Sequence, residues 1–140
     1  MAEQSTSERE ASEASAEERL PLTPAVFHIL LALAGGERHG YAIMREVAEQ
    51  TNGQMRLGPG TLYGSIRRML GEGVIEETEA RPDPTLDDER RRYYRLTPFG
   101  RRVAEAEAAR LQALTRTAQE RGLLRGFGTP GQPVGAGGLR

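Results

Sequence analysis

The chain contains no cysteine, no tryptophan and no lysine. Without cysteine, its 140 residues can form neither a disulfide framework nor a thiolate metal site. Aromatic residues make up only 5% of the sequence, and no apolar run approaches the roughly 18 residues that a membrane helix needs. The acidic N-terminus has no apolar signal core, so we expect a cytoplasmic protein that does not interact with a membrane.

Charge is distributed unevenly, although the net charge is only −1. Residues 1–20 hold six glutamates against two arginines, which gives a net charge of −4. Residues 21–125 hold sixteen arginines against fourteen acidic residues, which gives +2. All nineteen basic residues are arginine, whose planar guanidinium suits phosphate and guanine. The net charge therefore argues against a nucleic-acid partner, whereas the charge of the central part permits one.

Composition divides the chain into four parts. Residues 1–20 are rich in Glu, Ser and Ala, and we expect a disordered acidic tail there. The glycine- and proline-rich residues 122–140 predict a second disordered tail. Between the tails, the sequence predicts one compact domain over residues 21–97 and a long helix over residues 98–121.

Helix signals recur along the central part. Thr23 before Pro24 is a cap followed by a proline at the first helical position, and Gly35-Gly36 ends this first helix. A second helix is predicted from His39 to Thr51, with Asn52-Gly53 as its end. The predicted buried face of the second helix consists of Tyr41, Met44, Val47 and Ala48.

Residues 57–75, with the sequence LGPGTLYGSIRRMLGEGVI, are the most informative stretch. Pro59 suits a first helical turn, and Gly71 and Gly73 end the helix before a strand. The spacing of Leu62, Ile66, Met69 and Leu70 forms one apolar stripe.

The opposite face of this third helix is small at its start and cationic further on. It carries Gly60, Thr61, Tyr63, Gly64, Arg67 and Arg68. Such a face lets a helix lie deep in a DNA groove, with hydroxyls and arginines for phosphates or base edges. For Tyr63, packing against the second helix is the alternative interpretation.

Two strands, Val74–Ala80 and Arg91–Leu96, are predicted to pair as a hairpin. Alternation directs Tyr94 and Leu96 toward the core and favours Arg95 as a cross-strand partner of a glutamate. A role in DNA binding is predicted only for Arg90, Arg91 and Arg92. The acidic triplet at residues 87–89 would weaken that role.

Thr97-Pro98 repeats the cap-and-proline signal before the long helix. Its apolar seam consists of Phe99, Val103, Ala104, Ala108, Leu111, Leu114 and Ala118. Because a small domain cannot bury such a long helix alone, we expect a homodimer. Two copies would place their recognition helices about 34 Å apart on a palindromic operator.

The order of these elements predicts a mainly α fold with a small β-hairpin, a winged helix-turn-helix followed by one long C-terminal helix. The sequence also resembles the PadR family of transcriptional regulators. The matching segments are LTPAVFHILLAL (22–33), HGYAI (39–43), residues 57–75 and RRYYRLTPFG (91–100), within about residues 22–114. The single long helix resembles the short subfamily, whereas Gly58 departs from the serine cap that the family often has.

The resemblance implies a sequence-specific regulator of double-stranded DNA, acting as a homodimeric repressor associated with the nucleoid. It also implies a small-molecule effector of unknown identity, and a phosphate contact for His39 near Tyr41. The predicted DNA-binding residues are His39, Tyr41, Pro59, Gly60, Thr61, Tyr63, Gly64, Arg67, Arg68, Arg90, Arg91 and Arg92. The alternative is a winged helix that binds another protein without specific DNA binding.

Enzymatic chemistry is not expected, because the sequence contains no nucleophile–base pair, phosphate-binding loop or carboxylate dyad. No cofactor is predicted. The chain has two histidines and no cysteine, so no metal site is predicted either. His28 is predicted to be a core residue or a dimer contact.

Overall fold

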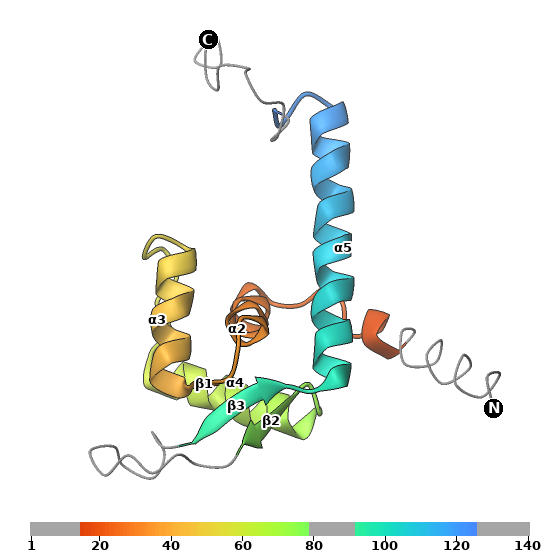
Figure 1. Cartoon of the computed structure of the whole chain (residues 1–140). Helices are drawn as coiled ribbons and strands as arrows, with labels where there is room; N and C mark the ends of the chain where they lie inside the picture. The colour runs from red at the N-terminus through yellow and green to blue at the C-terminus, as the bar shows by residue number, and fades with distance from the viewer. Residues whose placement is uncertain (1–14, 79–91, 126–140) are drawn as a thin grey trace, which may run out of the picture. The chain divides into compact units, whose positions relative to one another are not determined.

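The computed structural model describes residues 15–78 and 92–125. In chain order, the elements are α2 (Pro24–Ala34), β1 (Arg38–His39), α3 (Gly40–Gln50), α4 (Pro59–Gly71), β2 (Ile75–Thr78), β3 (Tyr93–Leu96) and α5 (Pro98–Glu120), as Figure 1 shows. The three strands form an antiparallel sheet in the order β1-β3-β2. The predicted winged helix is confirmed, with α3 and α4 as its helix-turn-helix and α5 as the long helix.

The predicted caps explain where α2 and α5 begin. The Thr23 hydroxyl accepts a hydrogen bond from the Val26 N–H at 3.3 Å, and Pro24 follows at the first position of α2. The Thr97 hydroxyl accepts from the Gly100 N–H at 2.9 Å, just before Pro98 begins α5. Both side chains supply an acceptor for an N–H that has no partner inside its own helix.

The turn between α3 and α4 depends on Thr51. Its hydroxyl donates to the Val47 carbonyl at 3.0 Å and accepts from the Met55 N–H at 2.9 Å. Asn52 and Gly53 then have φ angles of 51° and 80°, a left-handed conformation that these two residue types tolerate best. The predicted Asn-Gly stop is confirmed.

The core forms where the helices meet one face of the sheet. Leu62, Ile66 and Met69 of α4 are at most 1% exposed, so the predicted stripe is the buried side of that helix. Tyr94 of β3 is 3% exposed, and Leu96 packs against the core, as the alternation predicts. α2 contacts both α3 and β3, while α4 contacts α3 and β2.

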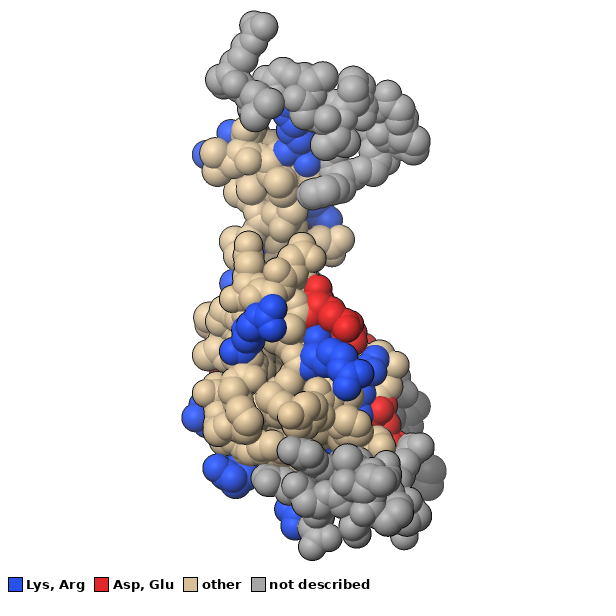
Figure 2. Space-filling view, turned by 90° about the vertical axis from the view of Figure 1, so that its left-hand side faces the viewer, with Lys and Arg blue, Asp and Glu red and all other residues tan. Residues whose placement is uncertain are grey.

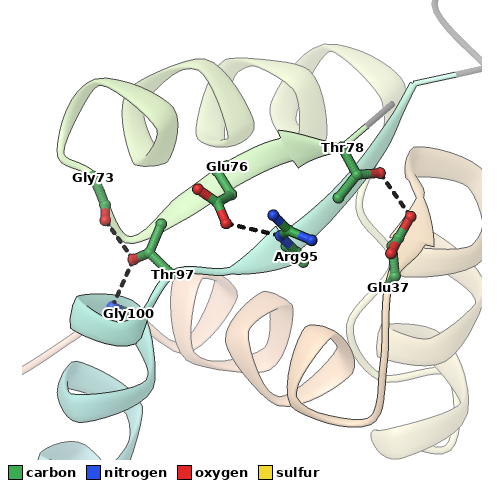
Figure 3. A network of polar contacts seen from close by, with 7 residues as sticks. All are labelled: Glu37, Gly73, Glu76, Thr78, Arg95, Thr97 and Gly100. Atoms are coloured by element: carbon green, nitrogen blue, oxygen red, sulfur yellow. Dashed lines mark hydrogen bonds and ion pairs between the residues drawn. The ribbon is translucent and has the colours of Figure 1, made fainter. Parts of the chain in front are cut away.

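The sheet has one strand more than the predicted hairpin. β1 pairs with β3 through His39 opposite Tyr93. A strand of two residues is too short for alternation to reveal it. On β2, Glu76 lies opposite Arg95 and their side chains form an ion pair at 2.7 Å, which confirms Arg95 as a cross-strand partner (Figure 3).

The prediction for the buried face of α3 is wrong at Tyr41. Gly40, Ile43 and Val47 are buried, whereas the Tyr41 side chain is 48% exposed. The three buried positions follow helical steps of three and four, and Tyr41 lies about 100° away from Gly40 around the helix. In the first turn of α3, Ile43 rather than Tyr41 is therefore the large side chain that is buried.

His28 is also not a core residue. It is half-buried, and its Nδ1 lies 2.8 Å from Oε1 of Gln50 in α3. The side chain therefore connects two helices at the surface of its own chain.

The predicted N-terminal tail extends too far. Residues 15–17 form a helical turn, and Ala16 is 1% exposed. Arg19 forms an ion pair with Glu72 at 3.3 Å and stacks over the Phe99 ring at 5.7 Å. Composition misses this segment because a small side chain and polar contacts, rather than bulky apolar residues, hold it.

One buried acidic side chain receives a hydrogen bond from the segment that leads into α2. Glu107 in α5 is 1% exposed, and its Oε2 accepts from the Leu22 N–H at 2.5 Å. A buried carboxylate needs such partners, since its desolvation is costly.

A left-handed glycine follows the last residues of α5. Gly122 has a φ of 73°, and the Leu123 N–H donates to the Ala118 carbonyl at 2.8 Å, so the predicted end near residue 121 is confirmed. By contacts, residues 1–108 and 109–140 form two units. Among the described residues, no helix is long and apolar enough to cross a membrane.

Replacing Glu107 by alanine is expected to lower the free energy of unfolding by about 1–3 kcal/mol, because the Leu22 N–H loses its acceptor. Urea unfolding measures this change. The control is Glu105→Ala on the same helix, whose side chain is exposed and whose loss should change stability by at most about 0.5 kcal/mol. Equal effects of the two substitutions would contradict a structural role for the Glu107 carboxylate.

Candidate nucleic-acid interface

The outward face of α4 has little side-chain bulk at its start. Pro59, Gly60 and Thr61 are exposed, and Gly64 is half-buried one turn later. Arg67 and Arg68 follow, both exposed, and neither forms an ion pair with another described residue. The structure thus brings together the residues predicted for this face, except Tyr63.

At two of these positions, no neighbour among the described residues requires glycine. A Cβ added to Gly60 or Gly64 would meet no atom within 4 Å. Each glycine nevertheless weakens a helix by roughly 0.5–1 kcal/mol relative to alanine. Packing against the described residues therefore does not explain the lack of a side chain at these two positions.

The first turn of α4 also leaves backbone donors uncapped. Gly58 is extended and makes no side-chain cap, while its carbonyl accepts from the Leu62 N–H at 2.9 Å. The N–H groups of Gly60 and Thr61 have no partner within the helix by the geometry of a helix end. Such a terminus favours an anion, because its donors and the helix dipole point at it.

Tyr63 lies against α3, as the alternative interpretation had it. A Cβ on Gly40 would come within 2.5 Å of the Tyr63 hydroxyl. The tyrosine thus occupies the space that the missing side chain of Gly40 leaves, and the two helices approach closely there. Gly40 was not singled out from the sequence, where the HGYAI segment was its only signal.

His39 caps α3 with its ring. Nδ1 accepts from the Ala42 N–H at 3.1 Å, and the ring meets the Tyr93 ring edge-on at 5.4 Å between centroids. Burial, and then the charge of Arg45, lower the pKa of His39 below its ordinary value of 6.5. At neutral pH, His39 is therefore uncharged and caps α3. Tyr41, two residues later, is exposed.

The wing supplies one described arginine of the predicted three. Arg92 pairs with Glu77 at 3.2 Å, and both side chains are about half exposed. Arg90 and Arg91 lie outside the described residues. The described base of the wing is therefore neutralised by its own glutamates, since Arg95 is also paired.

Positive charge on the face seen in Figure 2 occurs as separate patches, with acidic side chains directly beside one of them. A continuous basic band is not seen on this face.

The predicted seam of α5 divides into two parts. Leu111 and Leu114 are 36% and 55% exposed within the single chain, and Ala108 is exposed too. Val103 is different, because it is 1% exposed and belongs to the core of its own chain. The predicted contact of Val103 with a partner conflicts with this burial. Three further seam residues, Phe99, Ala104 and Ala118, are half-buried.

In the part of the chain that the structure describes, no three His, Cys, Asp or Glu side chains gather closely enough to hold a metal ion.

Comparison with known proteins places this arrangement in a family. The sequence profile of the family described as transcriptional regulator PadR-like matches residues 29–106, which is more than half of the chain. A transcriptional regulator of Mycobacterium tuberculosis is 32% identical over 89 residues, covering 64% of this chain and 77% of its own length. An uncharacterised 37.1 kDa transposon protein of Streptomyces fradiae is 39% identical over 87 residues, or 62% of this chain, but the match spans only 23% of that protein.

Solved structures share the fold. A PadR family transcription regulator from Clostridium difficile has a TM-score of 0.59 and 22% identity, covering 71% of this chain and 98% of its own. A transcriptional regulator from Clostridium thermocellum has a TM-score of 0.56 and 23% identity, covering 68% of this chain and 89% of its own.

The lowered pKa of His39 predicts an acid-sensitive α3. The unfolded chain binds a proton first as the pH falls, so the stabilisation from neutral His39 is complete above its ordinary value of 6.5 and is lost as the pH falls through the folded pKa. Urea unfolding from about pH 7.5 to about pH 5 should show wild type losing stability relative to His39→Asn, which caps without titrating. Parallel pH curves for the two proteins would contradict this role.

Proposed function

Because the chain belongs to the PadR-like family of transcriptional regulators, we propose that it binds double-stranded DNA sequence-specifically, as a homodimeric repressor on a palindromic operator. It would do so in the cytoplasm and would be released by a small-molecule effector. The family is one of regulators rather than enzymes, so the proposal includes no catalysis.

The observation that carries the proposal is the bare start of α4. Gly60 and Gly64 face open space, and glycine at both positions lets the helix backbone come close to a partner. The uncapped N–H groups of the first turn would then reach phosphate oxygens. Thr61, which is exposed between the glycines, could donate to a base edge or a phosphate.

Arg67 and Arg68 would contribute the salt-dependent part of the affinity. Both are exposed and follow the glycines by about one helical turn, so they suit the phosphate backbone better than the bases. Arg92 would first have to exchange its contact with Glu77 for a phosphate. The proposed complex therefore depends on close approach and a few arginines rather than on a large basic surface.

The exposed leucines of α5 support the proposed dimer. Leu111 and Leu114 lie three residues apart on one side of the helix and expose apolar surface in the single chain. A partner helix would cover this surface. The twofold axis of such a dimer would repeat the α4 interface and so favour a palindromic site.

The test is a binding selection with the purified full chain on genomic fragments, read by sequencing at two salt concentrations. We expect enrichment of a palindrome whose half-sites lie about one helical turn apart, with affinity that falls as salt rises. No enrichment at either salt would contradict the proposal. It would favour the alternative, a winged helix that binds another protein.

On the recovered operator, Gly64→Ala is expected to separate stability from binding. The added methyl meets no atom of the chain, so the free energy of unfolding should rise by about 0.5–1 kcal/mol while DNA affinity falls. Gly71→Ala, at the other end of α4 and also facing open space, is the matched control and should stabilise without weakening binding. Unchanged affinity in Gly64→Ala would remove the observation that carries the proposal.

The proposed dimer is tested by Leu111→Glu with Leu114→Glu, which would place two charges in the seam. We expect a monomer in analytical ultracentrifugation, because unpaired buried charge costs several kcal/mol. The control is Gln112→Glu with Ala113→Glu, which adds the same charge at exposed positions off the seam. A dimer that survives the leucine substitutions would show that the seam is wrongly placed.

A further inference from the structure

The first turn of α5 sits directly on the chain segment that leaves α4. The Thr97 N–H donates to the Val74 carbonyl at 3.2 Å, and the Thr97 hydroxyl donates to the Gly73 carbonyl at 2.5 Å. Figure 3 shows this hydroxyl between Gly73 on one side and the Gly100 N–H on the other. One side chain thus connects the end of the proposed recognition helix to the start of the long helix.

Gly100 makes the approach still closer. A Cβ at Gly100 would lie 1.7 Å from the Val74 carbonyl oxygen and 2.7 Å from its carbon. Both atoms belong to the backbone, so no rotation of a side chain could relieve the overlap. Any larger residue would therefore force the two segments apart by about 1 Å or more.

The surroundings of Gly100 differ from those of the glycines on the outward face of α4. Gly60 and Gly64 face open space, whereas the space beside Gly100 is filled by backbone. Glycine at position 100 therefore allows the start of α5 to lie close to the segment that follows α4. It does not make α4 accessible from outside. The buried side chain of Val103, one turn further along α5, holds the same end of the helix in the core.

We infer that Thr97 and Gly100 are positioning residues that set the separation of the two recognition helices in the dimer, and hence the spacing of operator half-sites. This inference rests on the proposed function. α5 is one helix of 23 residues, about 34 Å long, and it carries the proposed dimer seam. A small rotation at its first turn would therefore change where Ala104 and Ala108, two residues of the proposed seam, lie relative to α4, and one base pair spans about 3.4 Å.

The consequence concerns specificity rather than affinity for one half-site. Neither Thr97 nor Gly100 belongs to the exposed face of α4, so each half-site would still be read by the same side chains. A changed angle between α4 and α5 would instead alter the half-site spacing at which both α4 helices of the dimer can bind together.

The experiment uses Thr97→Val, which keeps the shape and removes the hydroxyl, and Gly100→Ala, which introduces the overlap. Thr97→Ser keeps both hydrogen bonds and should behave like wild type. Thr78→Val is a second control, because it removes a threonine hydroxyl that bonds Glu37 at 2.7 Å in the same sheet without touching α5 (Figure 3). All variants are first compared for folding and dimer formation.

The first readout needs no DNA. The chain has no cysteine, so spin labels at Arg68→Cys and Glu105→Cys, both exposed, both within residues 1–108 and both outside the proposed seam, report one α4–α5 distance. Labelled protein is diluted with unlabelled protein, so that only distances within a chain are measured. We expect a shifted or broadened distribution in Thr97→Val and Gly100→Ala, and wild-type distributions in both controls. Identical distributions in all proteins would overturn the inference, whichever way the chain binds DNA.

The second readout uses unlabelled proteins and the recovered operator, with its half-site spacing varied in single base pairs. Wild type and both controls should prefer one spacing by about tenfold or more, as expected for two half-sites that must bind together. Thr97→Val and Gly100→Ala should shift that optimum or flatten it to less than about threefold, with unchanged affinity for an isolated half-site. An unshifted, equally sharp optimum in Thr97→Val and Gly100→Ala would overturn the inference. A wild type that binds no operator would instead overturn the proposed function, and the distance measurement alone would then test the positioning role of Thr97 and Gly100.

Discussion

The burial of one stripe on α4 is the constraint on which the rest of the structure depends. Leu62, Ile66 and Met69 are removed from water almost completely, and burying side chains of this size stabilises the fold by about 1.5–3 kcal/mol each. Because these three side chains fix the rotation of the helix, its glycines, Thr61 and arginines must face outward. The interface is thus a consequence of the core rather than a separate feature built on it.

Elements with a repeating apolar pattern or a cap could be predicted from the sequence, whereas elements held by single contacts could not. Periodicity revealed α4, α5 and the core side of β3, because each is long enough or flanked by caps such as Thr23 and Thr97. It failed at Tyr41, since an amphipathic side chain was counted as apolar and placed on the buried side. It also failed for residues 15–20 and β1, where single contacts such as Arg19 with Glu72 replace any repeating pattern.

Electrostatics set a limit on how the proposed complex could form. The described base of the wing is neutralised by Glu76 and Glu77, and the whole chain carries a net charge of −1. Long-range attraction to DNA is therefore weak, and it is screened further beyond about 8–10 Å at physiological salt. Affinity would have to come from contacts made at close range, where exposed backbone donors and unpaired arginines are most effective. The helix start without bulky side chains permits such close contacts.

The distribution of exposed apolar side chains separates the surface that would meet DNA from the surfaces that would meet protein. The large apolar side chains exposed in the described residues are Leu31, Tyr41, Leu111, Leu114 and Leu123, and none of them is on α4. Protein interfaces depend on buried apolar and aromatic anchors, which the outward face of α4 does not have. The long helix has them, at Leu111 and Leu114. One element therefore suits a polar, anionic partner and the other an apolar one, and Thr97 and Gly100 lie at the point where the two elements are joined.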